Sequence, residues 1–146
     1  MIYSETDYAL TGYNEVLQAV YLVYKRKGTS AEFREANLQL VQAITRRPAQ
    51  RVLVDARAMG VVAPEDQRWV GAEIVLKLAS LAPNQYLYIA SLLSEHVFTK
   101  LAVQTVVEVS NSLGVCQNME FSSEEEAKDW LSRQPPQSPP YNVTIS

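Results

Sequence analysis

Short stretches rich in β-branched and aromatic residues alternate along this chain with stretches of helical periodicity. Two β-type stretches, 8–11 and 16–24, come first. The residues between them, Gly12-Tyr13-Asn14-Glu15, favour a turn, so the pattern predicts a β-hairpin. Three later stretches have the length and composition of strands. The first of these, Arg-Val-Leu-Val-Asp, is typical of a buried parallel strand. The three predicted strands are 51–55, 86–92 and 115–121.

Four helices are predicted between and after these strands. Thr29 and Glu32 have the spacing of a capping box, and apolar residues follow them at helical intervals until Pro48. Pro64 suits the first position of a second helix. Gly114 suits the end of the third helix, and Ser123 with Glu126 predicts another capping box. The last three helices are expected over 65–81, 95–113 and the residues after Ser123.

The resulting order, ββαβαβαβα, predicts a single α/β domain over residues 1–133. Its sheet is expected to be mixed, mostly parallel and five-stranded, with right-handed crossovers through the helices. Residues 134–146 form a proline-rich tail that ends in the β-favouring stretch Tyr141–Ile145. That stretch is expected either to be disordered or to pair with a sheet edge, of its own chain or of a partner.

Length, charge and composition argue against several classes of function. With 146 residues the chain is long enough for one well-filled core. A net charge of −3 and a pI of about 5.2 argue against nucleic-acid binding. A single cysteine, Cys116, and a single histidine, His96, cannot supply a structural zinc site, and no cofactor is expected. No apolar run is long enough to cross a membrane, so the sequence predicts a cytoplasmic protein.

Three segments together resemble a known family. The third predicted strand and its continuation read Val52-Leu53-Val54-Asp55-Ala56-Arg57, the second helix contains Gln67-Arg68-Trp69, and the chain has a closing segment with Phe121-Ser122-Ser123, Glu126-Ala127 and Trp130-Leu131. With the order of elements, these residues make 7–133 similar to the SpoIIAA-like (STAS and SEC14-like) domains. The resemblance implies a small regulatory or binding module without an established catalytic activity.

The chain departs from that family at the place of a regulatory phosphorylation site. Anti-sigma-factor antagonists of this superfamily are controlled by phosphorylation of a hydroxyl residue after the third strand. This chain has no Ser, Thr or Tyr from Asp55 through Ala79. Because a phosphoryl group needs an acceptor oxygen, we expect no such switch at this place.

Candidate site residues gather where the predicted strands end, since ligands of open α/β sheets bind beyond the carboxyl ends of the strands. Asp55 could cap backbone N–H groups or bind a partner, and Arg57 could bind an anion or form an ion pair. Ser94 could be a nucleophile beside His96, or simply the N-cap of the third helix, with His96 a surface or interface residue. Trp69 could pack in the core, lie at an interface, or line a pocket with Met59 and Val62.

The sequence thus favours a non-catalytic regulatory or protein-interaction domain, with a protein partner or a second copy bound through the second helix and the loop 56–63. The alternative is a carrier or sensor of a small apolar ligand such as a lipid, held by Met59, Val62, Leu76, Leu78 and Leu81. An enzyme is not expected, because no complete catalytic arrangement can be assembled from the residues at this edge.

Overall fold

The computed structural model describes residues 1–94 and 108–135. These residues form one mixed sheet of six strands in the order β1-β2-β3-β4-β5-β6. The first three strands are antiparallel neighbours, and β3 to β6 are parallel. The predicted single-domain α/β fold with a mixed sheet is confirmed. The strands are β1 (Ile2–Glu5), β2 (Ala9–Asn14), β3 (Ala19–Tyr24), β4 (Arg51–Asp55), β5 (Leu87–Leu92) and β6 (Cys116–Phe121).

The prediction of five strands is wrong, because it missed β1. This strand is only four residues long, and both ends, Ile2 and Glu5, are exposed. Its register against β2 also shifts between Ile2 and Ser4. An edge strand so short and so little buried leaves no clear alternation of apolar and polar residues in the sequence.

The predicted turn of the hairpin is displaced towards the C-terminus. Gly12 and Tyr13 lie within β2, and the turn is formed by residues 15–18. There Asn14 Oδ1 accepts a hydrogen bond from the backbone N–H of Leu17 over 3.0 Å. A Cβ atom at position 12 would collide with the Met1 carbonyl and the Tyr21 ring, so Gly12 serves close packing between strands, not a turn.

The helices largely follow the sequence prediction. Thr29 and Glu32 form the complete capping box of the first helix, as predicted. The second predicted helix is one continuous rod with a five-residue π-helical segment in its middle. Residues 108–112 are helical, but 95–107, most of the third predicted helix, lie outside the described residues. The helical elements are α1 (Ser30–Arg46), α2 (Pro64–Trp69), η1 (Val70–Ile74), α3 (Val75–Leu81), η2 (Pro83–Gln85) and α5 (Glu124–Ser132).

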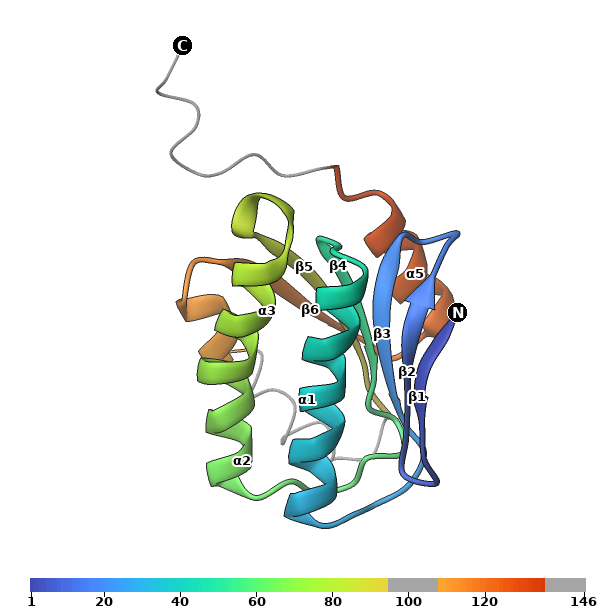
Figure 1. Cartoon of the computed structure of the whole chain (residues 1–146), viewed down its shortest axis with the longest axis vertical. Helices are drawn as coiled ribbons and strands as arrows, with labels where there is room; N and C mark the ends of the chain where they lie inside the picture. The colour runs from blue at the N-terminus through green and yellow to red at the C-terminus, as the bar shows by residue number, and fades with distance from the viewer. Residues whose placement is uncertain (95–107, 136–146) are drawn as a thin grey trace.

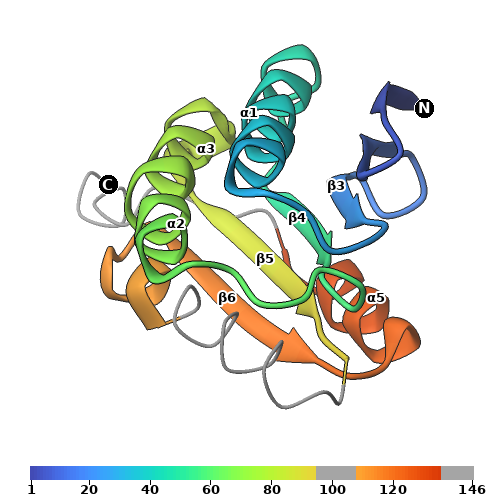
Figure 2. The ribbon, with the colours of Figure 1, turned by 90° about the horizontal axis from the view of Figure 1, so that it is seen from below.

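The elements form three layers (Figures 1 and 2). The helices α1, α2 and α3 cover one face of the sheet, and α5 packs on β4, β5 and β6 from the other side. Right-handed crossovers between parallel strands that follow each other in chain order bring their helices to the same face. The larger core lies beneath these helices, and a smaller one, which includes Ala127 and Leu131, lies beneath α5. No helix in 1–94 or 108–135 has the length and hydropathy of a membrane span.

Candidate functional site

Asp55 and Arg57 lie at the carboxyl end of β4, as predicted, and they bind each other. Arg57 donates from Nε to Asp55 Oδ1 over 3.0 Å and from Nη2 to Oδ2 over 2.7 Å. The backbone N–H of Arg57 also donates to Asp55 Oδ1 over 3.1 Å. Asp55 thus caps a backbone N–H group and Arg57 forms an ion pair, while binding of a partner or an anion by these residues stays a prediction.

A second carboxylate joins this pair from the opposite side of the sheet. Arg57 Nη2 lies 2.9 Å from Glu124 Oε1 at the start of α5, and Lys128 Nζ lies 3.0 Å from Glu124 Oε2. The ammonium of Lys128 and, to a smaller extent, Arg57 lower the pKa of Glu124. Two carboxylates and two cations thus form a network without net charge at this edge, and it connects the end of β4 to α5.

The strand order has no reversal at this edge. Ligands of open α/β sheets bind where the strand order reverses, but β3, β4, β5 and β6 follow one another without a reversal. Ser94 is half-buried beyond β5, and His96 lies outside the described residues. The arrangement of Ser94 beside His96 therefore remains a prediction.

The loop 56–63 after β4 is fixed by its own packing. Met59 and Val62 are buried, and the carboxamide Nε2 of Gln67 donates to the Val62 carbonyl over 2.7 Å. Gly60 has a φ of +79°, and the Lys27 side chain lies so close that a Cβ atom here would be 2.6 Å from Lys27 Cγ. Between these anchored residues Val61 points outward and is 68% exposed.

Trp69 belongs to the packing between helices. Its ring is half-buried against the larger core, and the Arg34 guanidinium of α1 lies 4.8 Å from the ring centroid. Trp69 thus packs against the core with part of its ring, it is not among the residues that line the cavity described below, and a role at an interface stays a prediction. Met59 and Val62, by contrast, do line a cavity, and so does Leu78, whereas Leu76 and Leu81 are exposed on α3.

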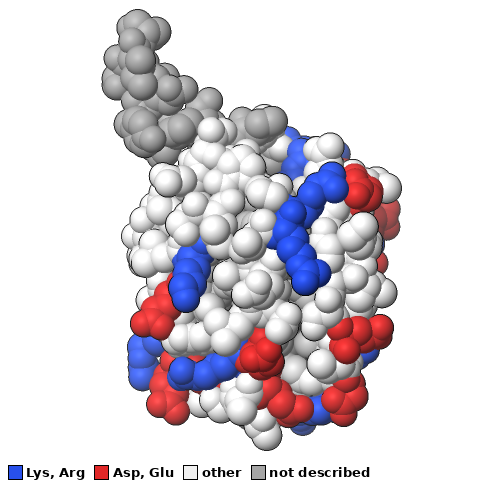
Figure 3. All heavy atoms as spheres, in the orientation of Figure 1, with Lys and Arg blue, Asp and Glu red and all other residues white. Residues whose placement is uncertain are grey.

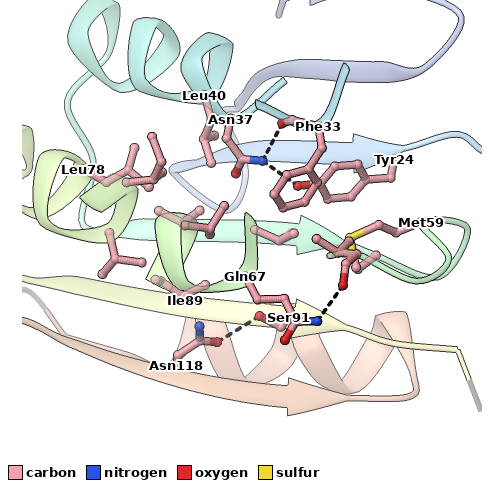
Figure 4. Close-up of a pocket in the computed structure, with 17 residues that line it drawn as sticks. Tyr24, Phe33, Asn37, Leu40, Met59, Gln67, Leu78, Ile89, Ser91 and Asn118 are labelled. Carbon is pink, nitrogen blue, oxygen red and sulfur yellow. Dashed lines mark hydrogen bonds between the residues drawn. The ribbon is translucent and has the colours of Figure 1, made fainter. Parts of the chain in front are cut away.

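That cavity lies between the sheet and the helices α1, η1 and α3, and has a volume of about 60 Å³ (Figure 4). Its walls are mostly apolar, but four buried neutral polar residues from four elements also contribute to them. These are Asn37 of α1, Gln67 of α2, Ser91 of β5 and Asn118 of β6.

Two of these residues, Ser91 and Asn118, are hydrogen-bonded to each other at the wall of the cavity. The Ser91 hydroxyl donates to Asn118 Oδ1 over 2.9 Å, and Asn118 Nδ2 donates to Ser110 Oγ over 3.2 Å. Asn111 adds two bonds to the backbone of Asn118, over 2.7 and 3.1 Å. This cluster joins β5, β6 and the helical residues 108–112, so it holds the sheet edge together.

The other two carboxamides use only their nitrogen atoms. Asn37 Nδ2 donates to the Tyr24 hydroxyl and to the Phe33 carbonyl, both over 2.9 Å, and Gln67 Nε2 donates to Val62. Within 1–94 and 108–135, nothing donates to Asn37 Oδ1 or Gln67 Oε1. As whole residues Asn37 is 3% exposed and Gln67 is 8% exposed, but water still reaches both carbonyl oxygens.

This cavity was not predicted from the sequence. Asn37 and Asn118 carried a weak signal, since each is a polar residue at a position where the periodicity expects an apolar one. Asn37 stands between Ala36 and Leu40 on the buried face of α1, and Asn118 takes the inward phase of β6. Only the tertiary structure brings the two together.

In the part of the chain that the structure describes, no three His, Cys, Asp or Glu side chains are grouped as metal ligands. Compared with protein-family models, curated proteins and solved structures, the chain matches none of them.

Proposed function

We propose that this protein is a non-catalytic regulatory domain that binds a protein partner through the loop 56–63 and the adjoining outer side of α2 and α3. The observation that carries the proposal is the exposed Val61 on a loop whose neighbours are anchored in the core. An apolar side chain held outward on a rigid loop loses little conformational entropy when a partner covers it. Leu76 and Leu81 are also exposed, on α3 of the rod that follows this loop.

The charge distribution supports a protein as the partner. In Figure 3, basic and acidic side chains are intermixed at the lower end of the visible face, where α1 and α2 begin, and much of the area above is uncharged. Nucleic-acid binding needs a concentration of positive charge, which this face does not have. An interface centred on an apolar anchor with a polar rim is usual for protein partners.

The polar groups near the sheet edge support a non-catalytic role. A serine nucleophile needs a base that takes its proton, but the Ser91 hydroxyl donates to an amide oxygen of Asn118. Asp55 and Arg57 are engaged with each other and with α5. These contacts support structural roles for Ser91, Asp55 and Arg57.

The lipid carrier receives less support. The cavity that Met59, Val62 and Leu78 line has a volume of about 60 Å³, well below the roughly 300 Å³ at which pockets for drug-sized ligands begin. Two of the five residues expected to hold an apolar ligand, Leu76 and Leu81, point to the surface instead.

A photo-crosslinking amino acid placed at Val61 tests the partner surface in the cells that make the protein. The matched control is the same substitution at Val16, which is 92% exposed but lies in the turn at the amino ends of the parallel strands. We expect a discrete adduct with one protein at position 61 and none at position 16. An adduct of twice the mass of the chain would identify the partner as a second copy. Equal labelling at both positions, or at neither, would contradict the proposal.

A further inference from the structure

We infer that the cavity beneath α1 and η1 is a binding site for a small uncharged molecule that donates hydrogen bonds to the carbonyl oxygens of Asn37 and Gln67. The inference goes beyond the proposed partner surface, and neither depends on the other. It rests on the unused acceptors of two buried side chains, on the absence of charge in the described wall, and on the volume of the space.

The polarity of the ligand follows from the acceptors. A carbonyl oxygen that faces a cavity and has no protein donor can accept a hydrogen bond from a molecule that enters the cavity. Both carboxamides have their nitrogen atoms turned to protein carbonyls or to the Tyr24 hydroxyl, which leaves Oδ1 of Asn37 and Oε1 of Gln67 for an incoming donor. A ligand with a hydroxyl or N–H group satisfies them, whereas one that only accepts does not.

The charge and size of the ligand follow from the wall. The polar residues that line the cavity, Asn37, Gln67, Ser91 and Asn118, are all neutral, so nothing among them would balance a buried ion. The remaining surface includes Leu40, Val75 and other aliphatic side chains that suit an apolar body. One water molecule needs about 10–15 Å³ of such space, so 60 Å³ has room for roughly four to six non-hydrogen atoms, the size of a short alcohol or amide.

The η1 segment adds an independent indication. Val70 and Ile74, its first and last residues, both line the cavity, and Val75 follows directly. A π-helical turn widens the hydrogen-bonding pattern of a helix and occurs frequently at functional sites. Here the irregular turn contributes to the wall of the same cavity as the two carboxamides.

Titration with 2-propanol and with acetone tests the site. The two probes have four non-hydrogen atoms and nearly the same shape, but only the alcohol donates a hydrogen bond. The signals to follow are the side-chain amide resonances of Asn37 and Gln67 in ¹H–¹⁵N spectra of the full chain. We expect a saturable shift with 2-propanol, with a Kd in the millimolar range that so small a ligand allows, and at least about a tenfold weaker response to acetone, the ratio that one lost hydrogen bond to a buried acceptor gives.

Two variants connect that preference to the acceptors. Gln67→Met keeps the length of the side chain but removes the carbonyl oxygen, so the preference for the alcohol should fall. Ile89→Val enlarges the cavity without changing a polar group, so the preference should persist, and this variant also controls for a loss of folding in the first. Equal binding of both probes would show a merely apolar space, and no saturable shift with either would show a hydration site only. Each of these results would overturn the inference.

Discussion

Arg34 on α1 donates a hydrogen bond from Nε to Oδ1 of Asp66 on α2 over 2.7 Å. The other carboxylate oxygen accepts from the Ser30 hydroxyl over 2.6 Å, and the Asp66 side chain is only 2% exposed. Burial by itself raises the pKa of Asp66, but the hydrogen bonds from Ser30 and Arg34 outweigh it, so that the pKa is lowered. An ionised carboxylate thus fastens the first turn of α1 to the first turn of α2.

Asp66→Asn should lower the free energy of unfolding at pH 7 by about 2 kcal/mol, because a hydrogen-bonded buried charge is lost. The lowered pKa also fixes the pH dependence. The stabilisation by Asp66 is fully present above its unfolded-state pKa, about 3.9, and is lost as pH falls through the lower folded-state value. Urea unfolding between pH 7 and pH 2 should therefore show a weaker acid dependence for Asp66→Asn than for the unchanged protein. The neighbouring exposed residue supplies the control, Glu65→Gln, and an acid dependence unaltered in Asp66→Asn would contradict the assignment.

Gly60 and Gly114 offer a matched pair, because their φ angles, +79° and +75°, are nearly the same. Alanine at either position adopts a left-handed conformation at a cost of roughly 1–2 kcal/mol. At Gly60 the new methyl group must also displace the Lys27 side chain, whereas no described atom lies within 4 Å of a Cβ at Gly114. Gly60→Ala should therefore destabilise the protein more than Gly114→Ala in denaturant unfolding. Equal losses would mean that Lys27 moves aside freely and does not brace the loop.

Much of the fold was predictable because its signals are local. The capping box of Thr29 with Glu32, the stretch Arg51–Asp55 and the position of Pro64 each depend on neighbours within a few residues, and the structure has them as predicted. The turn predicted at Gly12 was wrong, because a glycine that allows a neighbouring strand to approach cannot be distinguished by sequence from a glycine that makes a turn.

The candidate site was less predictable, because its contacts join distant residues. Arg57 and Glu124 are 67 positions apart, and Ser91 and Asn118 are 27 apart. Periodicity indicates that Asn37 faces inward but cannot say which other polar side chain shares its surroundings. The π-helical segment Val70–Ile74 likewise has no local signature that distinguishes it from an ordinary helix.

Arg57→Ala should cost less than about 1 kcal/mol, although Arg57 contacts two carboxylates. The Arg57 side chain is 44% exposed, and ion pairs that water reaches contribute little net stability. Because salt screens exposed charges, the effect of the substitution should shrink further in 1 M NaCl. Thermal unfolding at low and high salt measures this, with Arg133→Ala, which removes an i,i+4 pair with Asp129, as the control. A loss of several kcal/mol would show that the network at this edge is a main support of the fold.

Cys116 should be unreactive in the folded protein. Its side chain is buried in β6, and burial raises the pKa of the thiol to about 11, while the hydrogen bond to Ser110 opposes the shift. The thiolate is the reactive form, and an ordinary thiol has a pKa of about 8.5. At pH 8 we expect reaction with Ellman's reagent to be at least about 100-fold slower in the native protein than in 6 M guanidinium chloride. Because Cys116 is the only cysteine in the sequence, the measured reaction with Ellman's reagent comes entirely from this thiol.

The raised pKa of Cys116 also makes the free energy of unfolding decrease at alkaline pH. Between about pH 8.5 and 11 the unfolded chain loses the Cys116 proton while the folded chain keeps it, so the free energy of unfolding decreases as pH rises. Burial also raises the pKa of Tyr8 to about 12, which extends the decrease above pH 10. Cys116→Ala should remove the first part of this fall and leave the second, as urea unfolding at pH 8, 10 and 11 would show. An identical decrease in the variant between pH 8 and 10 would mean that the Cys116 thiol ionises equally readily in both states.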